Sequence, residues 1–114
     1  MAGYKPHSLI AAGSTNATLV QGHASELHGG YLYNAAAYAV FLKLYDSATA
    51  PTAGAGTPVL RIGVAAGVGV PIASLDLEGI SFTSGLGYTI TKLSADNDTT
   101  VVVAGDLLVN LFYR

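Results

Sequence analysis

The sequence of 114 residues contains no cysteine and no tryptophan. The absence of cysteine excludes a disulfide framework, a thiolate zinc site and a thiol nucleophile. Charge is also scarce, because charged residues make up 11% of the chain, less than half of the roughly 25% found in an average globular protein. Five basic and seven acidic residues leave a net charge of −2, which does not favour binding to a polyanion such as nucleic acid.

Long apolar runs are missing as well. The longest apolar stretches, such as residues 64–72, are interrupted by Gly67, Gly69 and Pro71. None of them reaches the roughly 18 residues that identify a membrane-spanning helix. The first residues lack the basic start and apolar core of a secretory signal. We therefore expect synthesis in a cytoplasm and no membrane partner.

Hydrophobic side chains are abundant, at 51% of the chain, which is enough to build one domain with its own core. Their main pattern is a period of two, which is typical of β-strands. The pattern is clearest in residues 38–46, 86–92 and 106–113.

The two faces of these strands predict what covers them. In residues 38–46 the expected core face is Val40, Leu42 and Leu44. The opposite face is amphipathic and could be covered by a partner; it consists of Phe41, Lys43 and Tyr45. In residues 106–113 both faces are largely apolar, so we expect this strand to be covered on both sides.

Shorter segments of the same kind fill the rest of the chain, separated by turns rich in Gly, Pro, Asn and Asp. They are residues 17–21, 25–34, 58–64, 68–72, 81–82 and 100–103, with a bulge expected at Gly29–Gly30. Residues 74–80 could form one helical turn.

Short strands with turns every 8–12 residues predict an all-β fold. We expect an antiparallel β-sandwich, jelly-roll-like, with about eight short strands. Residues 1–13 are expected to form an N-terminal arm and a first short strand, and residues 14–114 a single β-sandwich domain.

The polar residues do not assemble into a catalytic motif. Glu26 and His28 have the i, i+2 spacing of metal ligands on one strand face, but the rest of a ligand set is missing. The run 96–98 lacks the glycine and glutamate of a calcium loop, and residues 67–72 lack the third glycine of a dinucleotide loop. We therefore predict a protein that is not an enzyme and holds no metal or cofactor.

Seven tyrosines point to a possible interface, because tyrosine joins a large apolar ring to a hydroxyl group. Tyr31, Tyr33 and Tyr45 are the candidates for exposed rings, and the first two share a strand face. Three roles are open for such rings: closing the ends of the core, forming an assembly surface, or making a platform for carbohydrate.

Residues 4–7 precede the first expected strand as an extended arm. Such an arm is either frayed or laid across a neighbouring subunit. We predict that it contacts a neighbouring chain through Tyr4, Lys5, Pro6 and His7.

Several motifs along the chain resemble those of one protein family. They include Ala-Val-Phe-Leu-Lys-Leu-Tyr-Asp at residues 39–46, Thr-Pro-Val-Leu at residues 57–60 and Asp-Asn-Asp-Thr-Thr at residues 96–100. A further one is Phe-Thr-Ser-Gly-Leu-Gly-Tyr-Thr-Ile-Thr at residues 82–91. Over residues 14–114 the chain resembles a family of small β-sandwich virion proteins of tailed bacteriophages, which includes head decoration and cement proteins.

This resemblance implies a structural virion protein on the capsid exterior, synthesised in the host cytoplasm. Such a protein decorates or cements the head by binding major capsid protein subunits across the lattice, and it also binds itself as a homodimer or homotrimer. The alternative is a receptor- or carbohydrate-binding module of a tail or fibre. The family motifs are structural, so the predicted partner-binding residues come from the tyrosines and the arm: Tyr4, Lys5, Pro6, His7, Tyr31, Tyr33 and Tyr45.

Overall fold

A computed structural model of the protein describes residues 3–73 and 79–114. Within these residues all regular secondary structure is β-strand. The strands are β1 (Lys5–Ile10), β2 (Thr18–Gln21), β3 (Ser25–Asn34), β4 (Val40–Asp46), β5 (Leu60–Val64), β6 (Gly69–Ala73), β7 (Ile80–Phe82), β8 (Leu86–Thr91) and β9 (Leu107–Tyr113).

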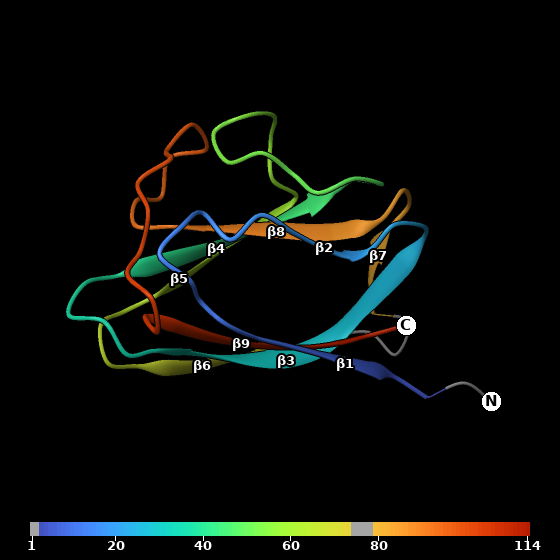
Figure 1. The fold of residues 1–114 in the computed structure, drawn as a ribbon. Coiled ribbons are helices and arrows are strands. Elements are labelled where there is room, and N and C mark those ends of the chain that lie inside the picture. Colours follow the sequence, from blue (N-terminus) through green and yellow to red (C-terminus); the bar gives the residue numbers. More distant parts are fainter. Residues whose placement is uncertain (1–2, 74–78) are drawn as a thin grey trace.

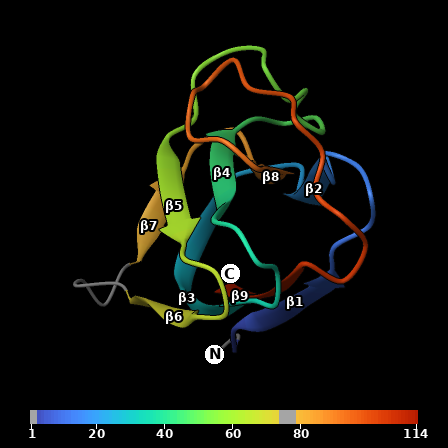
Figure 2. The ribbon, with the colours of Figure 1, turned by 90° about the vertical axis from the view of Figure 1, so that its left-hand side faces the viewer.

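The strands form two antiparallel sheets. Sheet A has the order β1-β9-β3-β6, with the short β7 also paired to β3, and sheet B has the order β2-β8-β4-β5. Figures 1 and 2 show the sheets as two layers facing each other. The predicted all-β antiparallel sandwich is therefore confirmed.

The core lies between the two layers. Val40, Leu42 and Leu44 of β4 are completely buried, as their alternation predicted. They meet alternate residues of β9, of which Leu107 and Val109 are also completely buried. Burial of each large aliphatic side chain contributes roughly 1.5–3 kcal/mol, so the period-two pattern accounts directly for how the sheets pack.

The N-terminal arm is part of sheet A. Strand β1 pairs with β9 along its full length, from Lys5 opposite Tyr113 to Ile10 opposite Leu108. The strand therefore begins earlier than the sequence predicted, because β9 offers a partner edge to residues that have little alternation of their own. Residues 4–7 are neither frayed nor detached from their own domain in this structure.

Two other segments differ from expectation or lie outside the description. Residues 100–103 run extended without a strand partner; Val102 is nevertheless buried against the core, with its neighbours Val101 and Val103 exposed. The helical turn predicted for residues 74–80 falls largely outside the described residues, and Ile80 begins β7.

Two long loops cover the outer face of sheet B: residues 47–59 and residues 92–106. The first loop and the start of the second lie beyond β4 and β8, on the side away from sheet A, and the second loop then runs to β9 (Figures 1 and 2). Pro51 of the first loop packs over Gly87, and the backbone oxygen of Ala95 in the second accepts a hydrogen bond from Lys43. Every residue of β8 is buried as a result.

Candidate protein-association surface

The outer face of sheet A is a continuous surface of apolar and uncharged polar residues. The strand registers arrange it in rows that cross β1, β9, β3 and β6. We call this set the apolar face; its rows are Pro6, Phe112, Gly29 and Ala73, then Ser8, Asn110, Tyr31 and Pro71, then Ile10, Leu108, Tyr33 and Gly69.

A β-bulge in β3 turns the two tyrosines onto this face. The register shifts between Leu27 and Gly29, so β3 holds one extra residue there. Leu27 and Leu32 are five residues apart, and unbroken alternation would place them on opposite faces, yet both are completely buried. Gly29 has φ = +153°, a backbone conformation that other residues rarely adopt. The bulge expected at Gly29–Gly30 is thus confirmed, and it directs Tyr31 and Tyr33 outward.

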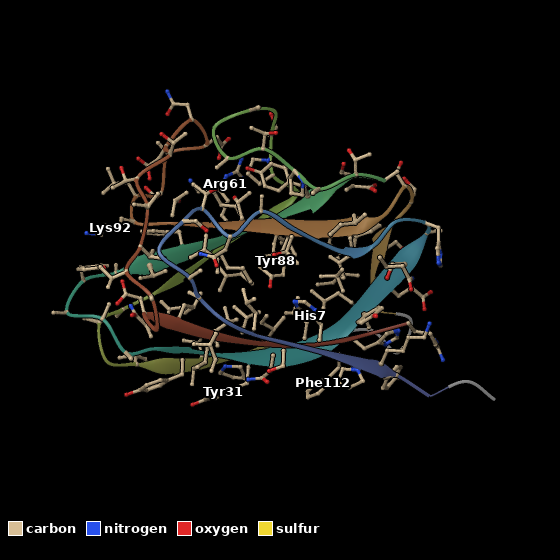
Figure 3. The ribbon with its side chains drawn as sticks, in the orientation of Figure 1. His7, Tyr31, Arg61, Tyr88, Lys92 and Phe112 are labelled. Carbon is tan, nitrogen blue, oxygen red and sulfur yellow. The ribbon has the colours of Figure 1, made fainter. Side chains whose placement is uncertain are left out.

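Large side chains on the apolar face remain in contact with solvent. Ile10 is 67% exposed, Tyr31 47% and Phe112 46%. Figure 3 shows Tyr31 and Phe112 on the side of sheet A that faces away from sheet B. No charged residue occurs in the three rows. Contiguous apolar surface of this kind, on a protein with few charges, is typical of a site that another protein covers.

The coverage of the outer faces of β4 and β9 differs from what the sequence predicted. On β4, the chain's own loops cover the amphipathic face; Tyr45 is 6% exposed and Lys43 1% exposed. Tyr45 is therefore not an exposed partner-binding ring, because the 47–59 loop folds over it. On β9, by contrast, Leu108 and Phe112 are exposed, so the described chain covers only one of the two sides that the sequence predicted to be covered.

A small polar cluster lies at one end of the apolar face. The ring of Tyr4 stacks on that of His28, with centroids 4.3 Å apart, and the Arg114 guanidinium lies 5.3 Å from the Tyr4 ring. His28 Nε2 and Arg114 Nε both donate to Glu26 Oε1, at 3.2 and 3.4 Å. These hydrogen bonds, led by that from His28, lower the pKa of Glu26. Glu26 and His28, which have the spacing of metal ligands in the sequence, thus pair with each other, and Glu26 also pairs with Arg114.

The four predicted arm residues have different surroundings. Tyr4 belongs to the cluster just described, and Pro6 lies on the apolar face. Lys5 is exposed. His7 points inward, where its Nε2 is hydrogen-bonded to the Tyr88 hydroxyl at 2.7 Å (Figure 3). Burial lowers the pKa of His7 and raises the pKa of Tyr88 to about 12.

Most other charged groups of the described chain hold loops in place. Asp46 accepts hydrogen bonds from the backbone N–H groups of residues 83–85, which lower its pKa. Arg61 donates to both carboxylate oxygens of Asp96, and this pairing lowers the pKa of Asp96. Lys92 lies 4.1 Å above the ring of Tyr38. These charges are used within the fold, which leaves the surface with little electrostatic means of attracting a partner.

An open hollow of about 520 Å³ lies beside β4, between Tyr38, Phe41, Lys92 and Leu93. Its lining is mainly apolar, and its one cation already contacts an aromatic ring. Within residues 3–73 and 79–114, no group of three or more His, Asp or Glu side chains is placed to hold a metal ion. In the same residues, no helix is long and apolar enough to cross a membrane.

No family model, curated protein or solved structure matches this chain.

Sequence reasoning missed several residues of this face. Ile10, Leu108 and Phe112 are exposed beside the predicted tyrosines but were not among the predicted site residues. A signal was present in residues 106–113, where both faces are apolar. That pattern shows that a second face is suited to burial, although it does not show whether the chain itself covers it.

Proposed function

We propose that the protein is a structural virion protein that decorates or cements the head of a tailed bacteriophage by binding major capsid protein subunits. The observation that carries the proposal is the apolar face of sheet A. It is exposed and uncharged, whereas the other sheet is covered by the chain's own loops. Covering such a face by a protein partner removes apolar surface from water. The sequence resemblance supports a virion as the place where this happens.

A small domain suits this role physically. A standard protein interface occupies about 800 Å² on each partner, roughly a seventh of the 5639 Å² surface of this chain. A protein that binds the mature lattice, and not its precursor, stabilises the mature lattice by mass action. The proposed role therefore needs interface area and shape, and no catalytic group.

The carboxylates of the described residues support a non-enzymatic role, because each has a structural hydrogen-bond donor. Those of Asp46 and Asp96 were described above. Asp98 accepts from Leu93 N–H and the Thr100 hydroxyl, and Asp106 from Tyr38 and Val103 N–H.

The strand order supports the jelly-roll part of the prediction. Apart from the three-residue β7, the chain passes between the sheets in the sequence A, B, A, B, B, A, B, A. Double-sheet jelly rolls of eight strands occur in viral capsid and lectin domains. This is an analogy of fold, and it supports the proposal without identifying the partner.

The proposal is tested with particles of the phage that carries this gene, produced without the protein. Purified wild-type protein is added back, and bound protein is located by cryo-electron microscopy and quantified by co-sedimentation. We expect density repeated over the head lattice. Phe112→Ser should weaken binding by about tenfold or more, as for a central aromatic contact.

The matched control is Val103→Ser, which removes an exposed apolar side chain from the 92–106 loop. It should bind heads like the wild type. Head binding that is unaffected by Phe112→Ser would contradict the role of the apolar face. Density at tail or fibre tips alone would contradict head decoration and support the receptor-binding alternative, in which Tyr31 and Tyr33 would be the first residues to test against host glycans.

A further inference from the structure

Strand β1 forms one edge of sheet A, and β6 forms the other (Figure 2). We infer that two copies of this chain join edge to edge through β1, with the two strands antiparallel. The two-fold axis passes between the two Ser8 residues, perpendicular to the sheet. This contact uses the edge of the sheet, so it leaves the apolar face available to the partner proposed above. It names the surface for the self-association that the sequence resemblance implies.

The edge of β1 presents backbone groups that have no partner strand. Ala11 N–H donates to the backbone oxygen of Leu107, and the register of β1 with β9 is unbroken. Because hydrogen-bonded pairs alternate along an antiparallel ladder, the odd-numbered residues of β1 bond to β9 and the even-numbered ones direct their N–H and C=O groups away from it. The outward donors are the N–H groups of Ser8 and Ile10, since Pro6 has none. In the described part of the chain, no loop or side-chain hydrogen bond uses these two donors.

These groups are complementary to those of a second β1. With Ser8 opposite Ser8, the two residues exchange both of their hydrogen bonds, and Ile10 N–H donates to Pro6 C=O at each end. Every outward donor then has an acceptor, and the N–H that proline lacks falls at the end of the ladder. A shift of two residues one way would place Ile10 opposite Tyr4, which precedes the strand and stacks on His28. A shift the other way would leave three paired residues in each strand instead of five.

The side chains of β1 that lie on the apolar face fit the same register. They are Pro6, Ser8 and Ile10, and Ile10 is 67% exposed. In the proposed pair, Ile10 lies beside Pro6 of the second copy, at the cross-strand distance where side chains pack. Because the axis is perpendicular to the sheet, both apolar faces lie on the same side of the pair. The dimer therefore presents one continuous apolar surface about twice as wide as that of a single chain.

The other three sheet edges carry features that discourage strand pairing, namely short length, bulges, charge and proline. Strand β2 has four residues and an irregular register with β8. Strand β5 carries the charged Arg61, and β6 has Pro71 at its centre. On β1 the residues of this kind, Lys5 and Pro6, are both at the start, so residues 8–10 contain neither charge nor proline. The β1 edge is therefore the one best suited to pairing.

Sedimentation equilibrium without any capsid tests the inference. Interfaces smaller than about 1,200 Å² are typically weak, so the protein is measured from about 10 µM to about 1 mM. The mass should rise from 11.6 kDa toward that of a dimer. Ser8→Pro should weaken the dimer by about tenfold or more, because it removes both central N–H donors and leaves the ladder with β9 intact. Ser8→Ala, which keeps the N–H, is the matched control and should dimerise like the wild type. Circular dichroism confirms that each variant is folded.

Disulfide formation tests the register, since the chain has no cysteine of its own. The Cα atoms of a hydrogen-bonded antiparallel pair are about 5.5 Å apart, a distance that a disulfide can span. Oxidation should therefore join Ser8→Cys to a second copy of itself. The two copies of Ile10→Cys would lie about 14 Å apart along the strands. That variant should be joined at a much lower yield, although residue 10 is also exposed.

A monomer at about 1 mM overturns the inference, as does a dimer that Ser8→Pro leaves intact or an equal disulfide yield in the two cysteine variants. These results are separable from the test of function, which depends on Phe112. A dimer that binds no phage particle would sustain the inference and contradict the proposed function. A monomer whose head binding is lost in Ser8→Pro and kept in Ser8→Ala would overturn the inference and assign the β1 edge to an extended segment of the capsid protein.

Discussion

His7 is a titratable side chain placed against the core. Its ring meets the Tyr88 ring edge-on, with centroids 5.5 Å apart, and its Nε2 is hydrogen-bonded to the Tyr88 hydroxyl. No charged side chain among the described residues is hydrogen-bonded to it. Burial without a counter-charge lowers the pKa of His7 from its usual 6.5, because the charged imidazolium is the form that loses hydration.

This burial predicts a loss of stability in mild acid. Between pH 6.5 and the lower pKa of the folded state, the unfolded chain binds more protons at His7 than the folded chain does. The His7 contribution is therefore complete above pH 6.5 and is lost as the pH falls through the folded pKa. In His7→Gln, whose amide can keep the hydrogen bond to Tyr88, the urea midpoint should change less between pH 7 and pH 5.

The comparison of the wild type with His7→Gln can also contradict this prediction. The lowered pKa values of Asp46 and Asp96 act in a separate window, because their contributions are lost only as the pH falls below about 4. Parallel curves for the wild type and His7→Gln above pH 5 would show that His7 does not determine the acid response.

Lys43 is a second titratable side chain that is buried within the fold. Its side chain is 1% exposed, and its ammonium donates to the backbone oxygen of Ala95. Desolvation lowers the pKa of Lys43, and the carboxylates of Asp98 and Asp96 oppose that effect. A lysine on a strand ordinarily indicates a solvated face. Here it fastens the 92–106 loop over sheet B instead.

At the scale of a strand, the close approach of β3 to β9 is the feature that positions the apolar face. A Cβ atom on Gly30 would lie 2.2 Å from the backbone oxygen of Asn110. Only glycine permits this spacing, which follows directly on the bulge at Gly29 and keeps the two strands in register.

We therefore predict that Gly30→Ala destabilises the protein by about 2 kcal/mol or more, as expected when strands of a packed sheet are forced apart. Urea unfolding at pH 7 measures the change in free energy of unfolding. The control is Gly13→Ala, whose new Cβ would meet its nearest atoms at 3.7 and 3.8 Å. It should be nearly neutral, and an equal loss in both variants would contradict the close-approach argument.

At the scale of the whole molecule, the two outer faces of the sandwich differ in whether loops cover them. Loops 47–59 and 92–106 cover sheet B, and Figure 2 shows both beyond β4 and β8, from where the second runs to β9. Sheet A has no such cover among the described residues, although it carries the larger share of exposed aromatic side chains. This asymmetry supports the proposal that the protein associates with a partner through sheet A.

Association of that face with the capsid predicts a higher melting temperature for bound than for free protein. A partner that binds only the folded chain stabilises it by mass action. Differential scanning calorimetry with added phage heads should show this rise for the wild type and Val103→Ser. A similar rise in Phe112→Ser, or no rise in the wild type, would contradict association through the apolar face.

Much of the fold is determined by the sequence itself. Alternation of apolar residues placed strands β4, β8 and β9, and it identified the core face of β4 correctly. Gly29–Gly30 predicted the bulge. These features are local: a side chain's face depends on its immediate neighbours along the strand, and bulges depend on the conformational freedom of glycine.

The tertiary structure alone decided which outer face is covered. Tyr45 and Phe112 both lie opposite a core face, and their strands give no local reason to bury one and expose the other. The difference arises because loops far along the chain fold over β4, held by contacts such as Lys43 with Ala95 and Arg61 with Asp96. Likewise, residues 5–7 become strand because β9 offers them an edge. Coverage and pairing depend on groups distant in sequence, and a local pattern carries no information about them.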